Sequence, residues 1–363
     1  MRVVISGCGL VTAVGRSAAA SCAAIRAGIA RPRRVSYFQA LDEESQEEVP
    51  VTGYPIQGYT EGFNMVGRWL RLARGAAREL LSSSGLPDSK DGRFWQKTGL
   101  ITVTPRPNDA RFQNEDGEGE EALRKAFLGP LYNALALPLS PQHLDVVGLG
   151  HAGTATAVHR AVEQLSRGAL DRVLIVAVDS YLDPLTLQWL ASSHRLKTEA
   201  VPTGLSPGEA GACLLLETQP SAARRGAAAP VLVTGIATGQ ESHSFLSGEP
   251  NTGAALAACI REALEQSALQ GAFRGEVYSD LNGESWRAME WGSALVRLAG
   301  RVAEPHLHLP CVSVGDVGAA SGALGACLAV HELSRGHART PHALVVSSSD
   351  GGEVGCLSLQ PAS

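Results

Sequence analysis

The chain contains 363 residues, of which 44% are hydrophobic and 18% are charged. This length fits one large domain or two ordinary ones, and the apolar content excludes a disordered chain. The 31 Lys and Arg residues are outnumbered by 36 Asp and Glu residues, so the net charge is −5. Without a basic excess, we expect no nucleic-acid partner and no attachment to a membrane surface.

The seven cysteines are odd in number, and none stands in a Cys-x-x-Cys motif. Most lie in apolar runs, which predicts reduced, buried thiols in a cytoplasmic protein. The sequence begins directly with an expected strand, so we predict no signal peptide, and no apolar run is long enough to span a membrane. His306 and His308 alternate on a short extended run and are interpreted as surface residues. No metal and no cofactor is expected.

In chain order, the first unit is a strand, a glycine turn and a helix, which is typical of an α/β protein. Apolar spacing predicts a second helix, and two polar stretches predict loops. The predicted elements are a strand at 2–7, a helix at 17–28, a loop at 31–60, a helix at 66–84, an exposed loop at 105–120 and a short helix at 121–127.

An internal repeat is the most informative feature of the sequence. Residues 148–168 (GLGHAGTATAVHRAVEQLSRG) align without a gap to residues 316–336 (DVGAASGALGACLAVHELSRG), and both end in Leu-Ser-Arg-Gly. An apolar, strand-like run ending in Asp follows each copy. A second pair, 2–7 and 230–235, matches in the same order. The repeat therefore predicts a duplicated α/β fold.

The two halves are predicted to form one body. A stretch rich in Pro, Gly and Arg near residue 225 suits a surface connection, which divides the chain into 1–225 and 226–363. In each half the small-residue helix of the repeat lacks a polar face, as expected for a helix buried between two sheets. We therefore predict a five-layer αβαβα arrangement.

Three further motifs point to a known family. They are the opening strand and glycine-rich turn at 3–15, the glycine-rich segment GLSPGEAGACLLLE at 204–217 and the glycine turn SDGGEVG at 349–355. Together with the duplication, they resemble the thiolase-fold condensing enzymes, specifically the β-ketoacyl-acyl-carrier-protein synthases. The resemblance implies a thiolase-like fold, a homodimer or a heterodimer with an active synthase, and an acyl carrier protein as a possible partner.

The resemblance also locates the catalytic positions, and there the sequence departs from the family. Such enzymes carry an acyl group on a Cys at the start of the buried helix, assisted by two His residues from the second half. Here the nucleophile position falls on His151, and the two histidine positions fall on Asn282 and Asp316. The resemblance thus implies a degenerate Cys-His-His triad.

Two interpretations of these three residues stay open. Asp316 can orient His151 as a general base, with Asn282 as an oxyanion donor, which describes an acyltransferase or a thioester or ester hydrolase. Alternatively, the three side chains fill a vestigial pocket and hydrogen-bond one another. The start of a helix disfavours a cation, so we expect His151 to be neutral.

Several residues are candidates for substrate binding. Tyr181 and Leu182 follow a strand, in a stretch that in the family lies near the pocket and the dimer interface; a plain turn is the alternative. Asp350 belongs to the C-terminal glycine turn. Glu284 and Trp286 stand beside Asn282, with Arg287 and Glu290 next along the chain, and either plug the acyl channel or lie on the surface.

Three functions are compatible with the sequence. The first is a non-catalytic binding or assembly subunit similar to a chain-length factor, which pairs with a competent synthase. The second is an enzyme that uses His151 and Asp316, as described above. The third is a protein scaffold or adaptor without an acyl ligand.

Overall fold

The protein is described from a computed structural model, which covers residues 1–42, 45–107, 110–112, 119–228 and 230–362. Its strands are β1 (Val3–Val11), β2 (Arg33–Leu41), β3 (Glu48–Gly53), β4 (Thr98–Thr104), β5 (Leu144–Gly148), β6 (Arg172–Ser180), β7 (Glu209–Thr218), β8 (Val231–Gln240), β9 (Glu276–Ser279), β10 (His306–His308), β11 (Ala343–Ser348) and β12 (Glu353–Pro361). Its helices are α1 (Ala18–Arg26), α2 (Val66–Ser83), α3 (Gly92–Gln96), α4 (Gly119–Leu123), α5 (Gly129–Leu135), α6 (Gly153–Ser166), α7 (Pro184–Ser192), α8 (Gln219–Arg224), α9 (Ala254–Gln266), α10 (Ser285–Arg297), α11 (Cys311–Val314) and α12 (Ser321–Ser334).

The described strands other than β2 and β3 form one ten-stranded sheet in the order β10-β9-β11-β12-β8-β1-β7-β6-β4-β5. We number the strands of this sheet along the chain within each half, leaving out β2 and β3. Read from its outer edge to the junction, each half then has the order third, second, fourth, fifth, first. In each half the second strand pairs in parallel with the third and fourth, and the fifth pairs antiparallel with the fourth and first. The duplicated fold is therefore confirmed, while the division at residue 225 stays a prediction.

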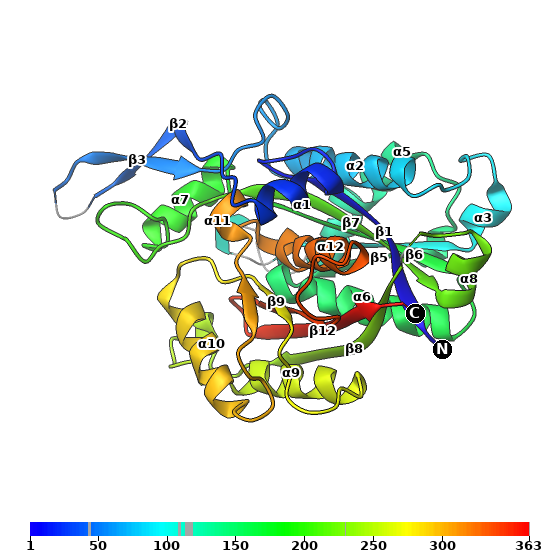
Figure 1. The fold of residues 1–363 in the computed structure, drawn as a ribbon. Coiled ribbons are helices and arrows are strands. Elements are labelled where there is room, and N and C mark those ends of the chain that lie inside the picture. Colours follow the sequence, from blue (N-terminus) through cyan, green and yellow to red (C-terminus); the bar gives the residue numbers. More distant parts are fainter. Residues whose placement is uncertain (43–44, 108–109, 113–118, 229, 363) are drawn as a thin grey trace.

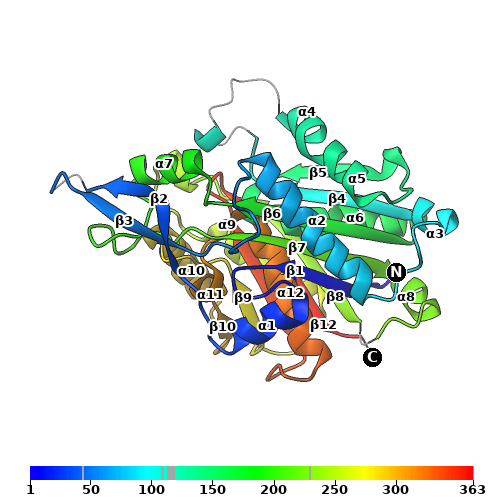
Figure 2. The ribbon, with the colours of Figure 1, turned by 90° about the horizontal axis from the view of Figure 1, so that it is seen from above.

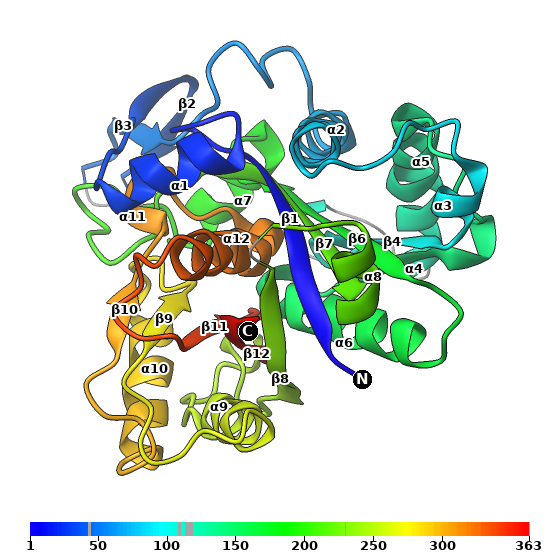
Figure 3. The same ribbon diagram turned by 45° about the vertical axis from the view of Figure 1, so that its right-hand side comes forward.

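The halves meet where β1 and β8 pair antiparallel over three residues each. From this junction the two five-stranded parts diverge and enclose α6 and α12, as Figures 1 and 3 show. Helix α2 covers the outer face of the first part, and α9 covers the outer face of the second (Figure 1). These layers give the predicted αβαβα arrangement.

The central helices repeat one local plan. A turn of 3-10 helix precedes each, at Gly150–Ala152 before α6 and at Gly318–Ala320 before α12, and both helices have 14 residues. Helix α12 is buried along nearly its whole length, since small residues let both sheets approach it. The prediction of no polar face was wrong for α6, where His159 and Glu163 are exposed on the flank that the sheets leave open.

Close approach of the outer helices depends on glycines in the first strand of each half. A Cβ atom at Gly9 would lie 2.1 Å from the carbonyl oxygen of Ala76 in α2. A Cβ at Gly235 would lie 2.1 Å from the carbonyl oxygen of Ala263 in α9. Because real Cβ atoms do not come so close to backbone, only glycine fits at these two positions.

The predicted loop at 31–60 was wrong, because β2 and β3 form an antiparallel hairpin there. The hairpin is a separate two-stranded sheet that projects from one end of the molecule, as Figures 1 and 2 show. Val35, Ala40 and Val51 are buried, but most of its other side chains are exposed, and a register shift between Arg34 and Gln39 interrupts the alternation by which a half-buried strand is recognised in sequence.

The prediction that residues 105–120 form an exposed loop is wrong at Arg111, whose side chain is buried and only 2% exposed. Its guanidinium forms an ion pair with Asp179, with an Nη2–Oδ2 distance of 3.0 Å. Residues 108–109 and 113–118 of this stretch lie outside the described residues. Among the helices described, none is both long and apolar enough to cross a membrane.

Candidate functional site

The duplicated turns bring one residue from each half together at the centre of the molecule. His151 lies in the 3-10 turn before α6, and Asp316 lies two residues before the corresponding turn of α12. Gly150 and Gly318 begin these turns with φ of +64° and +51°, a conformation that favours glycine. Asp316 Oδ1 accepts the Gly318 N–H at 2.8 Å, which fixes its carboxylate beside the turn.

His151, Asp316 and Asn282 form a buried hydrogen-bonded group. His151 Nε2 lies 2.9 Å from Asp316 Oδ1, and Asn282 Nδ2 donates to Asp316 Oδ2 at 2.6 Å. His151 and Asp316 are each 3% exposed and Asn282 is 8% exposed. The three residues that the sequence assigned to the triad positions are thus in direct contact, through side chains from three separate segments.

Arg287, on α10, extends this group next to the imidazole. Its Nη2 lies 3.3 Å from His151 Nδ1 and 3.4 Å from Nε2, and its Nη1 donates to Asp280 Oδ2 at 3.1 Å and to the Ser348 carbonyl at 2.5 Å. Arg287 is 2% exposed, so its charge depends on these contacts. One of the two predictions for this part of the chain was that its side chains lie on the surface. That prediction is wrong, since Glu284, Arg287 and Glu290 are all buried.

A second arginine, Arg195, connects two of the predicted site residues. Its Nε donates to Glu284 Oε1 at 2.6 Å, and its Nη1 donates to Asp350 Oδ2 at 2.6 Å. Glu284 in turn accepts from Asn282 Nδ2 at 2.8 Å, and Asp350 accepts from Arg287 at 3.4 Å. No motif in the sequence points to Arg195, which follows α7.

The remaining predicted site residues lie around this network with different contacts. Tyr181 is buried, and its ring lies edge-on to His151, with centroids 6.4 Å apart. Leu182 is buried in a separate apolar cluster beside the β2–β3 hairpin. Trp286 is half-buried and stacks on Phe245, with ring centroids 5.4 Å apart, so its indole lies outside the hydrogen-bonded group.

Electrostatics favour a charged pair at the centre of the site. Burial and Arg287 act to lower the pKa of His151, but the facing Asp316 carboxylate outweighs them and the pKa is raised. Burial acts to raise the pKa of Asp316, but His151 and Arg287 outweigh it and the pKa is strongly lowered. The prediction of a neutral His151 was therefore wrong, because the carboxylate contact prevails over the helix start.

The hydrogen bonds leave little chemical freedom. Asp316 pairs with Nε2 of His151, Arg287 Nη2 lies 3.3–3.4 Å from both ring nitrogens, and both amide hydrogens of Asn282 have acceptors. Two cavities of about 10 Å³ flank the group, one beside Asp316 and one beside Arg287. Each has room for about one water molecule.

No protein-family model matches the chain. A Streptomyces halstedii protein assigned as polyketide beta-ketoacyl synthase 1 is 25% identical over 298 residues, which cover 74% of this chain and 70% of that protein. A chain of a type II polyketide ketosynthase, solved with its acyl carrier protein, aligns with a TM-score of 0.77 and 16% identity over 100% of this chain and 99% of that one. The chain has the thiolase-like ketosynthase fold. The ishigamide ketosynthase/chain length factor gives the same TM-score and coverage, with 19% identity.

The pair at the centre of this ketosynthase fold predicts how stability depends on pH. Because the folded-state pKa of His151 is raised, its contribution to the free energy of unfolding is present below about pH 6.5 and is lost as pH rises through the folded pKa. Because the pKa of Asp316 is lowered, the contribution of Asp316 to the same free energy is present at every pH above about 4. Urea unfolding of wild type and His151→Gln between about pH 6 and 9 should show the wild-type advantage shrinking as pH rises. A constant difference would contradict the charged pair.

Proposed function

We propose that this chain is a ketosynthase-fold protein with a degenerate triad and no condensing activity, which acts as an assembly subunit similar to a chain-length factor. The observation that carries the proposal is the state of His151. It stands at the position that the resemblance assigns to the nucleophile, its Nε2 is paired with Asp316, and its raised pKa favours the imidazolium form. An imidazolium presents no free electron pair to a thioester.

No thiol near the site replaces the missing nucleophile among the described residues. Burial raises the pKa of the Cys311 thiol to about 12, and the Asp316 carboxylate acts in the same direction. Its Sγ–H donates to the Leu281 carbonyl at 2.7 Å. Since the thiolate is the reactive species, a thiol that stays protonated at neutral pH cannot take an acyl group efficiently.

The geometry does not favour the alternative of an acyltransferase or hydrolase. A general base needs an acceptor nitrogen directed at water or substrate, and an oxyanion donor needs a free N–H. Here the imidazole is paired with Asp316, and the Asn282 amide is committed to Asp316 and Glu284. The buried, hydrogen-bonded site also suits a scaffold without an acyl ligand, which differs from our proposal in needing no ketosynthase or carrier protein.

The partners follow from the same proposal. One similar structure is a ketosynthase/chain length factor, and another contains an acyl carrier protein with its ketosynthase. In this chain β5 forms the outer edge of the first half of the sheet, where it pairs only with β4 among the described strands. We propose that this edge pairs with a second ketosynthase-fold chain, either another copy or an active synthase.

Two assays test the proposal. The purified chain is expected to have twice its monomer mass by light scattering at micromolar concentration, or to acquire a dimer mass with an active type II ketosynthase. Mixed with acyl- and malonyl-loaded carrier protein, it should form no β-ketoacyl product, while the active ketosynthase does so under the same conditions. A monomer under both conditions, or product formed by the chain alone, would contradict the proposal.

A further inference from the structure

The edge of the second half of the sheet gathers four polar side chains on one face. Strand β10 pairs in parallel with β9, with His306 opposite Glu276 and His308 opposite Tyr278. Because side chains two residues apart on a strand lie on the same face, this register places all four together. None of the four belongs to the hydrogen-bonded group around His151.

The two histidines share one carboxylate oxygen. His306 Nδ1 lies 2.5 Å and His308 Nε2 lies 2.7 Å from Glu276 Oε2. The other oxygen of Glu276 accepts the backbone N–H of Arg339 at 2.8 Å, which orients the carboxylate. The His308 ring stacks on Tyr278, with centroids 4.5 Å apart and planes 9° from parallel. Both a carboxylate and an imidazole ring are therefore held in place by neighbouring groups.

We propose that Glu276, His306 and His308 bind a divalent transition-metal ion of the zinc class. Two imidazoles and one carboxylate are the donors that zinc takes in open sites, where a fourth position is left for water. The three donor atoms lie within 4.8 Å of one another. Metal bonds of about 2.0–2.2 Å separate tetrahedral ligands by roughly 3.3 Å, so the imidazoles need to move back by less than about 1 Å.

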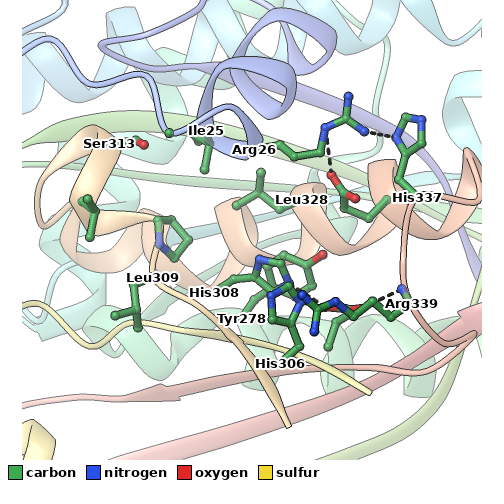
Figure 4. Close-up of a pocket in the computed structure, with 15 residues that line it drawn as sticks. Ile25, Arg26, Tyr278, His306, His308, Leu309, Ser313, Leu328, His337 and Arg339 are labelled. Atoms are coloured by element: carbon green, nitrogen blue, oxygen red, sulfur yellow. Dashed lines mark hydrogen bonds and ion pairs between the residues drawn. The ribbon is translucent and has the colours of Figure 1, made fainter. Parts of the chain in front are cut away.

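The site is accessible from a cavity of about 360 Å³, whose lining includes all three ligands and Tyr278 (Figure 4). Tyr278 is 2% exposed, and its hydroxyl has no hydrogen-bond partner among the described residues. His306 and His308 keep about a third of their side-chain surface in contact with solvent, while Glu276 is buried. A hydrated ion can thus reach the ligands and keep one water on the cavity side.

A second group consists of His331, Glu332 and His337, of which Glu332 and His337 line the same cavity, but it suits a cation less well. The Arg26 guanidinium contacts His337 Nδ1 and lies 3.8 Å from Glu332 Oε1, as the dashed lines in Figure 4 show. A positive charge therefore already occupies the acceptors that a metal would need. The cluster on β9 and β10 has its carboxylate oxygen directed at two imidazoles and is the better site.

The full-length chain, stripped with a chelator, tests the proposal by titration with Zn²⁺ in a calorimeter and with Co²⁺ in a visible spectrometer. We expect one equivalent to bind and the Co²⁺ spectrum to be that of a four-coordinate nitrogen and oxygen site. Glu276→Gln, His306→Asn and His308→Asn should each weaken binding by at least about 100-fold, because loss of a mere outer-shell partner already costs 10–100-fold. His159→Asn, on the exposed flank of α6, is the matched control and should bind like wild type.

Thermal melting gives a readout that does not depend on any activity. At a hundredfold excess over its dissociation constant, Zn²⁺ should raise the melting temperature of wild type by about 3–5 °C and leave that of the His306→Asn/His308→Asn variant unchanged. Equal melting of both chains in chelator shows that the variant folds. Binding that survives in the double variant, binding lost in His337→Asn instead, or no binding by wild type would each overturn the assignment.

Discussion

Replacing Arg287 with alanine is expected to destabilise the protein by about 3–5 kcal/mol. The guanidinium is buried and pairs with Asp280 Oδ2 at 3.1 Å, while its second nitrogen lies 3.4 Å from Asp350 Oδ1. Without it, two carboxylates and the Ser348 carbonyl lose a donor in a buried region, and a buried charge left unpaired is costly.

The loss should be measured as the free energy of unfolding in urea at neutral pH. Arg297→Ala is the matched control, since Arg297 lies on the same helix, is exposed and donates to a single carbonyl. It should change stability by no more than about 0.5 kcal/mol. Burial already raises the pKa of Asp280, so this carboxyl takes up a proton when Arg287 is absent, and the cost should shrink as pH falls. Equal effects of the two arginine variants would contradict the network described here.

Asp316→Ala is expected to have a similar cost, about 3–5 kcal/mol, because it removes the acceptor of three hydrogen bonds at once. His151, Asn282 and the Gly318 N–H would all lose their partner. With Asp316 gone, burial and Arg287 lower the pKa of His151 without opposition from that carboxylate. The pH dependence described above should therefore reverse in this variant, because a folded-state pKa below the unfolded one makes stability rise with pH near 6.5.

A double-mutant cycle with His151→Ala isolates the pair. The two losses should be non-additive, with a coupling of about 0.5–3 kcal/mol, because the double variant leaves neither charge unpaired. Glu304→Ala, which breaks an exposed ion pair with Arg274, is the control and should cost less than about 1 kcal/mol. Additive losses at 151 and 316 would show that the two side chains do not interact in solution.

The fold was largely predictable because its central feature is visible in short stretches of sequence. Each copy of the repeat, 168 residues apart, contains a turn, a helix and a strand. The structure has all three in both copies, with α6 and β6 in the first and α12 and β11 in the second. The β2–β3 hairpin was missed for the opposite reason. Most of its side chains are exposed, and the few buried ones in β2 do not follow a strict alternation.

The site was predictable in part. The residues that the resemblance assigns to the triad meet at the centre, but their charge state depends on Asp316 prevailing over burial, which spacing does not reveal. Arg195 could not be found, because its two carboxylate partners come from positions 89 and 155 residues away. His306 and His308 were interpreted as surface residues, since only the register of β10 against β9 places Glu276 between them.

The central claim is that the chain holds a ketosynthase fold around a residue that cannot be acylated. Intact-mass measurement after incubation with acyl-loaded carrier protein tests this most directly, with an active ketosynthase as the positive control. We expect the chain to keep its unmodified mass while the control gains one acyl group. A covalent acyl adduct on this chain, mapped by peptide fragmentation to His151 or to a cysteine, would contradict it.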